Sequence, residues 1–323
     1  MTYRILSLDG GGIRGVIAAV ILAEIEKQLD KPLNEYFDLI AGTSTGSILA
    51  GAVALGFKSE KIISLYKEQG QRIFPYQSLF SPQRLGLLFK YGLSAPKYPD
   101  NGLIAVLQEQ FGTVKLSDIN DSPQLMIIAY DTLDREPIIF KSWRKDEAYF
   151  NIPLWEACVC SSSAPTFFPA HLLQTPKKRY SVIDGGVGAN NPAASALAEA
   201  LRLRYPIDEI SVLSIGTGSS EQPFPWEEAR SWGVSQWLWQ GRLLDVVFDA
   251  SSDIADYITR QVLNAPGMNK QGCDRYLRLQ PRIMNYEIDD ARPENIANLV
   301  MFSQDYIEQK KDLVKRFLND NCS

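Results

Sequence analysis

The chain has 323 residues, of which 45% are hydrophobic and 22% are charged, and its formal net charge is −5. These values describe an ordinary folded globular protein and exclude a disordered or fibrous chain. The acidic balance also argues against a nucleic-acid-binding protein, which usually carries a basic excess, so we expect no nucleic-acid partner.

Histidine and cysteine are too few to hold a metal ion. With one histidine and four cysteines, no zinc-ligand set can form at a usual spacing, so we expect no metal and no cofactor. A disulfide framework is not expected in so long a chain, and we expect a reducing, cytoplasmic setting. We find no signal-peptide pattern and no apolar run of membrane-spanning length, so any membrane contact would be peripheral. The cysteines are Cys158, Cys160, Cys273 and Cys322.

Short apolar runs alternate along the chain with segments of helical period. The alternation predicts one α/β domain with a mostly parallel sheet covered by helices on both faces, and the C-terminal part is helical. The region 81–101 is expected to be a loop or excursion. Strands are predicted at residues 3–9, 37–42, 124–131, 136–143, 180–186, 210–218 and 276–281. Helices are predicted at residues 15–29, 45–56, 191–204 and 242–263.

The first glycine-rich turn, "DGGGIRG", follows the first strand and opens a helix. It satisfies the G-x-G-x-x-G pattern of a dinucleotide fold, but the second strand ends in glycine where that fold needs an acidic residue. Amides at a helix N-terminus also suit a developing oxyanion, and Gly10, Gly11 and Gly12 would supply them. We expect Arg14 to steady this loop or to face an anionic substrate group, and a surface arginine without a role is the alternative.

The second turn, "GTSTG", lies between a strand and a helix. A nucleophile elbow places a serine on such a turn with small flanking residues, here Ser44 between Gly42 and Gly46. The alternative is a helix N-cap, because serine and threonine are preferred at that position.

The third turn, "DGG", places Asp184 at the carboxyl end of a strand, where open α/β sheets bind ligands. The alternative is an aspartate that only bonds its own turn. His171 precedes Asp184, whereas α/β-hydrolases carry the histidine last, so a Ser–His–Asp triad is not expected. We therefore predict that Asp184 takes the proton of Ser44 directly. A carboxylate is a weak base, with a pKa of about 3.9, but it can accept this proton when it is close and shielded from water.

With these three turns in this order, the sequence resembles the patatin-like phospholipases over residues 3–281. The resemblance implies a three-layer α/β/α sandwich, with residues 5–198 as the catalytic region. Residues 199–323 would complete the same domain with mainly helical segments. It implies that Ser44 is the nucleophile, that Asp184 is the base, and that Gly10, Gly11, Gly12 and Arg14 surround the oxyanion. The motif-supporting glycines are Gly15, Gly42, Gly46, Gly185 and Gly186.

The resemblance implies a lipid acyl hydrolase that cleaves fatty-acyl esters of phospholipids or galactolipids with a Ser–Asp dyad and no metal. The alternatives are an acyltransferase with the same acyl-enzyme, a nucleotide-binding or regulatory module that uses "GGGIRG", and a storage or effector protein with latent hydrolysis. The sequence sets no oligomeric state.

Two segments have the composition of a membrane-contacting surface. Ser81–Leu93 mixes apolar and basic residues as an interfacial helix does, and residues 226–240 hold four of the six tryptophans. We expect transient, peripheral contact with the membrane that holds the lipid substrate. The alternative is that these residues belong to the core. The four tryptophans are Trp226, Trp232, Trp237 and Trp239.

Overall fold

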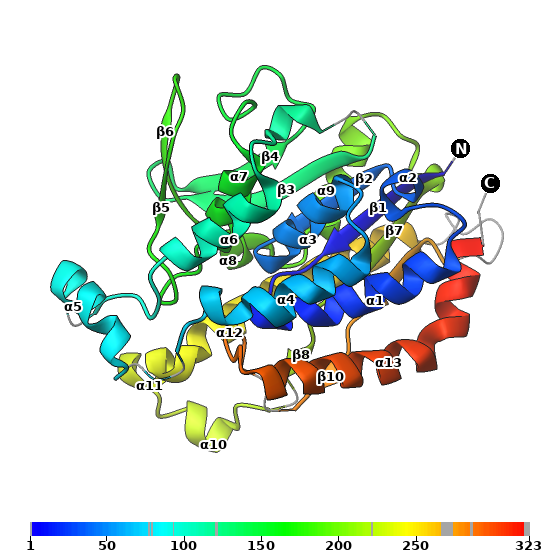
Figure 1. Cartoon of the computed structure of the whole chain (residues 1–323). Helices are drawn as coiled ribbons and strands as arrows, with labels where there is room; N and C mark the ends of the chain where they lie inside the picture. The colour runs from blue at the N-terminus through cyan, green and yellow to red at the C-terminus, as the bar shows by residue number, and fades with distance from the viewer. Residues whose placement is uncertain are drawn as a thin grey trace.

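A computed structural model of the chain describes residues 2–76, 78, 80–92, 94–119, 122–220, 222–265, 274–284 and 287–319 (Figure 1). Leu93, which ends one expected membrane segment, lies outside these residues, and so do Cys273 and Cys322. Cys158 and Cys160 are buried and carry free thiols.

The centre of the molecule is an 8-stranded sheet with the strand order β5-β6-β3-β2-β1-β7-β9, and β4 pairs with β3. In the part of the sheet ordered β3-β2-β1-β7-β9, all neighbouring strands are parallel. Strands β4 and β6 run antiparallel to β3, and β5 runs antiparallel to β6. The mostly parallel sheet predicted from the sequence is confirmed. The strands are β1 (Tyr3–Leu8), β2 (Leu39–Thr43), β3 (Gln124–Asp131), β4 (Glu136–Lys141), β5 (His171–Gln174), β6 (Arg179–Asp184), β7 (Ile210–Ile215) and β9 (Tyr276–Leu279). A separate parallel pair consists of β8 (Ser219–Ser220) and β10 (Arg282–Ile283).

Helices cover both faces of this sheet and make it the middle of three layers. The larger helices are α1 (Gly15–Gln28), α3 (Thr45–Ala54), α4 (Ser59–Ile73), α6 (Asn101–Phe111), α7 (Leu154–Ser162), α9 (Ala193–Arg202), α12 (Arg242–Leu263) and α13 (Pro293–Asn319). The shorter ones are α2 (Leu33–Tyr36), α5 (Leu85–Tyr91), α8 (Gly186–Ala189), α10 (Trp226–Ala229) and α11 (Val234–Leu238). The C-terminal α13 packs along α1 (Figure 1). No described helix is both long and apolar enough to cross a membrane.

Successive residues of the central strands enter two different cores. Leu6 of β1 and Ile40 of β2 join the core that includes residues of α1, α3 and α7. Their neighbours Ile5 and Leu39 join the core that includes residues of α9. Side chains alternate between the two faces of a strand, so a strand that is covered on both faces must be apolar at every position. This explains the uninterrupted apolar runs seen in the sequence.

The arrangement of β2 and β6 brings two of the three turns together. Both strands pair with the same edge of β3, because β4 occupies its other edge. Thr43 at the end of β2 pairs with Ile128, and Asp184 at the end of β6 pairs with the next residue, Ala129. The two strands therefore meet end to end, and Ser44 lies where they meet. Asp184 does end a strand, as expected, but this strand is antiparallel to its neighbour.

Candidate active site

Ser44 occupies a sharp turn between β2 and α3. Its backbone has φ 54° and ψ −128°, a conformation that non-glycine residues seldom adopt. Strain of this kind persists where surrounding structure enforces it, and it is concentrated at functional sites. The Ser44 side chain makes no capping hydrogen bond to α3, so the N-cap alternative does not describe this serine.

The glycines that flank Ser44 allow three backbone segments to pack closely. A Cβ on Gly42 would overlap the carbonyl of Gly46, and a Cβ on Gly46 would overlap the carbonyl of Leu8 in β1. Any side chain at either position would push α3 away from the sheet. The small residues of the motif are therefore required by packing.

Hydrogen bonds hold the Ser44 backbone from two sides. The Ser44 amide donates to the Ser161 hydroxyl at 2.8 Å, and that hydroxyl donates to the Ile128 carbonyl at 2.5 Å. On the other side, the Ser47 hydroxyl donates to the Ser44 carbonyl at 2.6 Å. The strained turn is thus fixed to both β3 and α3.

Asp184 is buried beside Ser44, and its turn is held in a similar way. Its amide donates to the Ser163 carbonyl at 3.0 Å, and its Oδ1 accepts the Gly186 amide at 2.7 Å. A Cβ on Gly185 would overlap the Ile128 carbonyl, so the turn packs directly on β3. Its Oδ2 is buried and has no hydrogen-bond partner among the described residues. One carboxylate oxygen is therefore positioned by the fold and the other is left for chemistry.

Burial changes the acidity of this carboxyl group. Desolvation raises the pKa of Asp184 from 3.8 to about 7, while the nearby Ser44 hydroxyl and the Gly186 amide counteract part of that effect. A base is most effective when its pKa lies near the working pH. The weakness of an ordinary carboxylate as a base is thus largely removed here.

Two amides of the glycine-rich loop have no hydrogen-bond acceptor among the described residues. The Gly10 amide already donates to the Asn190 carbonyl at 3.1 Å, and the Ile13 amide donates to the Ile288 carbonyl at 2.8 Å. The Gly11 and Gly12 amides have no acceptor within the described part of the chain, and both residues line the pocket that contains Ser44. Of the three glycines expected to supply oxyanion donors, two are therefore available.

Residues from the C-terminal part of the chain anchor the start of this loop. Arg278 of β9 forms a paired contact with the buried Asp9 carboxylate, at 2.8 and 2.5 Å, and Ser252 of α12 donates to it at 3.0 Å. The Thr217 hydroxyl donates to the Gly10 carbonyl at 2.6 Å. These residues could not be predicted from the sequence, since no spacing relates them to the loop.

Arg14 is partly buried and does not line the pocket. Burial lowers the pKa of its guanidinium, and the carboxylates of Asp245 and Asp249 on α12 oppose that change. The structure thus associates Arg14 with α12, in keeping with a role in steadying the loop. Its neighbour Gly15 leaves room for the Tyr66 hydroxyl, which a Cβ would overlap.

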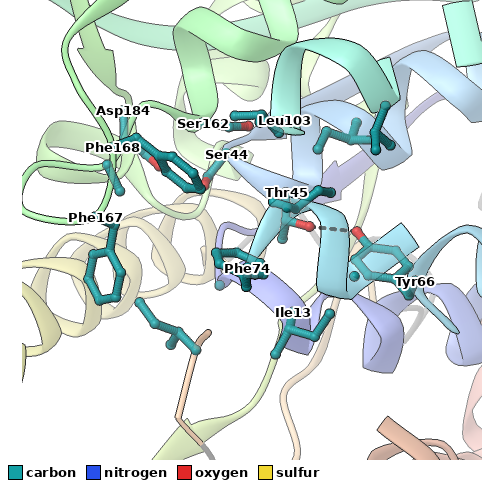
Figure 2. A pocket seen from close by; sticks show the side chains of 18 of the residues that line it. Ile13, Ser44, Thr45, Tyr66, Phe74, Leu103, Ser162, Phe167, Phe168 and Asp184 are labelled. Atoms are coloured by element: carbon teal, nitrogen blue, oxygen red, sulfur yellow. Dashed lines mark hydrogen bonds between the residues drawn. The ribbon is translucent and has the colours of Figure 1, made fainter. Parts of the chain in front are cut away.

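A pocket of about 760 Å³, part of it open to solvent, extends from Ser44 and Asp184 (Figure 2). Its wall is mostly apolar, and most of it was not foreseen from the sequence. The apolar residues come from the glycine-rich loop, from α3, α4, α6 and α12, and from the loops after α4, α7 and β10: Ile13, Ile48, Leu65, Ile73, Phe74, Leu103, Val106, Leu107, Ala164, Phe167, Phe168, Phe248 and Ile288. Beside the nucleophile and the base, its polar side chains are Thr45, Tyr66 and Ser162.

His171 lies apart from this pocket. It begins β5, and its Nε2 is 3.3 Å from the Glu156 carboxylate. It does not line the pocket, so the described geometry contains no Ser–His–Asp triad. Within the same described ranges, no group of three or more histidine, cysteine, aspartate and glutamate residues could hold a metal ion.

Comparison with known proteins places these features in a family. A family model described as patatin-like phospholipase matches residues 6–197. Patatin-like protein 1 of Arabidopsis thaliana is 32% identical, with 91% of this chain and 79% of that protein covered. Patatin-like protein 2 of Oryza sativa subsp. indica is 30% identical, with 93% and 82% covered. The solved structure of human GIVD cytosolic phospholipase A2 in complex with methyl gamma-linolenyl fluorophosphonate is similar at a TM-score of 0.49 and 13% identity, and the alignment covers 99% of this chain and 59% of that one.

Proposed function

The chain belongs to the patatin-like phospholipase family of lipid acyl hydrolases, and we propose that Ser44 attacks the fatty-acyl ester while Asp184 acts as its base. The observation that carries this proposal is the Asp184 carboxyl group. It is buried beside Ser44, its pKa is raised to about 7, and its Oδ2 has no partner among the described residues. Such a group can accept the serine proton without a histidine between them.

In the first step, the Ser44 Oγ attacks the ester carbonyl carbon as its proton moves to Asp184. The negative charge that develops on the carbonyl oxygen is stabilised by the Gly11 and Gly12 amides and by the N-terminal end of α3. The alcohol part of the lipid leaves with the proton from Asp184, and the acyl group stays on Ser44. In the second step, water gives a proton to Asp184 and attacks the acyl-enzyme, and Ser44 recovers its proton as the fatty acid departs.

The pocket supports a lipid substrate. The pocket wall beyond Ser44 consists mostly of aromatic and aliphatic side chains, as is typical of sites that bind apolar ligands. Among the described residues that line it, Asp184 has the one charged side chain. We propose that a fatty-acyl chain of a phospholipid or galactolipid fills this space and that its polar head group remains outside.

Two exposed segments support contact with a membrane. Phe80 and Phe89, beside and within α5, are 96% and 90% exposed. Trp226 and Trp239, at either end of the α10–α11 region, are 69% and 64% exposed. In Figure 1 both segments project from the same end of the molecule. Aromatic side chains favour the membrane interface, and we propose that these four make peripheral contact with it.

Trp232 and Trp237 have a different role. They are partly buried and pack edge to face against each other, with ring centroids 5.1 Å apart. Phe224 adds a third ring, 5.3 Å from Trp232. Of the four expected tryptophans, these two support the segment from within.

Both exposed segments connect directly to the pocket wall. After α5, the chain runs beside the loop that follows α7 and lines the pocket. The Lys97 and Tyr98 amides donate to the Thr166 and Phe167 carbonyls of that loop, both at 2.8 Å. The α10–α11 region continues into α12, which places Phe248 in the pocket. A lipid met by these segments would lie close to the catalytic cleft.

We also propose a cytoplasmic setting, which the free thiols of Cys158 and Cys160 support.

The test is release of free fatty acid from phospholipid and galactolipid vesicles by wild type and by the variants Ser44→Ala, Asp184→Ala and His171→Ala. We expect the first two variants to be inactive and His171→Ala to match wild type. A folded but inactive His171→Ala variant would overturn the dyad. A wild type that releases no fatty acid from either vesicle would overturn the substrate class.

A further inference from the structure

Three consecutive serines at the end of α7 connect the two halves of the catalytic site. The Ser161 hydroxyl accepts the Ser44 amide at 2.8 Å, and the Ser163 carbonyl accepts the Asp184 amide at 3.0 Å. The Ser163 hydroxyl donates back to the Val159 carbonyl at 2.8 Å. The first and third serines therefore have structural partners, whereas the Ser162 hydroxyl has no hydrogen-bond partner among the described residues.

Ser162 places an unpaired hydroxyl in the catalytic pocket. It is 7% exposed, and its Oγ is buried without a hydrogen-bond partner in the described chain. It lines the same pocket as Ser44 and Asp184, and Figure 2 shows it close to Ser44. A buried hydroxyl without a partner is unfavourable, so such groups are rare in folded proteins and a role in catalysis or in binding water is one reason for them.

The second half of the reaction needs one hydrogen-bonding group that the first half does not. Ser44 has a single proton to give, and Asp184 can take it. The attacking water has two protons, of which Asp184 can take only one. The other hydroxyls along the pocket wall, those of Thr45 and Tyr66, bond each other at 2.5 Å. Among the described hydroxyls of the pocket wall, that of Ser162 has no hydrogen-bond partner, so it can accept the second hydrogen bond of the water without breaking another.

We propose that the Ser162 hydroxyl holds and orients the water that hydrolyses the acyl-enzyme, an inference that rests on the proposed acyl-hydrolase function. The water oxygen forms a bond to the acyl carbon while one of its protons moves to Asp184. The second proton stays on the water oxygen, in a hydrogen bond to Ser162. When the bond between the carbon and the Ser44 Oγ breaks, Asp184 returns the proton to Ser44. Ser162 gains and loses no atoms, so it is a positioning residue that contacts the attacking water.

The test uses a p-nitrophenyl ester of a medium-chain fatty acid, with wild type, Ser162→Ala and Ser303→Ala compared in rapid mixing. Loss of one hydrogen bond predicts a kcat about tenfold lower for Ser162→Ala, with kcat/KM changed less than about twofold. With Ser162→Ala, a burst of nitrophenol close to one equivalent of enzyme should precede the slow steady state. Mass spectrometry of the intact protein should then show an acyl group on Ser44. Ser303→Ala is the matched control, because it removes a buried helical hydroxyl that bonds the Leu299 carbonyl outside the pocket, and it should resemble wild type.

Two results would overturn the role of Ser162. One is an equal fall in kcat and kcat/KM without accumulated acyl-enzyme, which would indicate a structural or acylation role. The other is unchanged kinetics. Ser162→Thr, which keeps the hydroxyl, should restore kcat if orientation of water is the cause. A wild type that does not hydrolyse the ester, or a Ser44→Ala variant that turns over normally, would instead reject the proposed function together with this inference.

Discussion

The floor of the pocket and the exposed end of the molecule are built in opposite ways. Around Ser44 and Asp184, backbone amides are held by specific partners, and glycines are packed so closely that a single carbon would not fit. Around α5 and the α10–α11 region, large aromatic side chains are exposed, and Gly86 within α5 has no other atom within 4 Å of an added Cβ. The floor has to fix atoms for a reaction, whereas the exposed end has to meet a surface of variable structure.

This contrast implies that substitutions in the two regions should affect different measurements. Changes at the floor should alter the chemical step or the fold, even with a small soluble ester. Changes at the exposed end should alter only the encounter with lipid. The predictions below test that separation, in order of decreasing effect.

The largest effect is expected from Asp184→Asn. The amide has nearly the same shape as the carboxyl group but cannot accept the serine proton, so we expect kcat/KM for a soluble ester to fall about 10³-fold or more. Ester turnover and thermal unfolding should be measured together. Glu156→Gln, which changes the carboxylate beside His171, is the matched control and should keep full activity. An Asp184→Asn variant with near-normal turnover would reject the dyad.

The next effect is on stability, when a glycine is replaced in α3 near the catalytic residues or in α5 at the exposed end. Gly46→Ala would force a carbon into the Leu8 carbonyl, and we expect a loss of about 3 kcal/mol in the free energy of unfolding. Gly86→Ala meets nothing, and it should leave stability unchanged or raise it by up to about 1 kcal/mol. Denaturant unfolding of both variants measures the difference. Equal losses would show that the two regions are packed alike.

A smaller effect is expected when the exposed aromatic residues are replaced. The double variants Phe80→Ser/Phe89→Ser and Trp226→Ser/Trp239→Ser should each bind phospholipid vesicles at least about tenfold more weakly, because each loses apolar surface that would enter the interface.

Co-sedimentation with vesicles measures this binding. Turnover of a soluble ester should stay within about twofold of wild type, since none of these side chains lines the pocket. Leu133→Ser/Met301→Ser, which removes exposed apolar residues from a turn and from α13, is the matched control. Equal weakening of the control would show that exposed apolar surface in general, rather than these segments, carries the binding.

The smallest effect is the pH dependence set by Asp184. Because its pKa is raised to about 7, kcat/KM for a soluble ester should rise as pH passes through 7 and level off above it. The same group affects stability with the opposite sign. Its folded pKa lies above the unfolded value of 3.8, so its favourable contribution is complete below pH 3.8 and is lost as pH rises toward 7. Unfolding measured from pH 4 to 8 should lack this component in Asp184→Asn.

Most of the fold could be predicted from the sequence, because buried strands and amphipathic helices have distinct periods. All seven predicted strands are present, and α12 has the predicted bounds, 242–263. The short β5, β8 and β10 were not predicted, since two to four residues carry too little pattern. The antiparallel direction of β6 was also missed, because an apolar run does not reveal its direction or its neighbour.

The site was predicted in part for a similar reason. Ser44, Asp184 and the glycine loop belong to local motifs, which a short stretch of sequence displays completely. Arg278, Phe248 and Ser162 reach the site through tertiary packing and carry no local signal. In the run "SSSAPTFFPA", the three serines look alike in sequence, and only the structure separates their roles.

The most direct test of the central claim is the rate at which a fluorophosphonate reagent labels Ser44, measured from pH 5 to 9 for wild type, Asp184→Asn and His171→Ala. A Ser44–Asp184 dyad predicts labelling of wild type that increases through about pH 7, the same profile for His171→Ala, and almost none for Asp184→Asn. Loss of labelling in a folded His171→Ala variant would contradict the dyad, and so would an Asp184→Asn variant that is labelled at the wild-type rate.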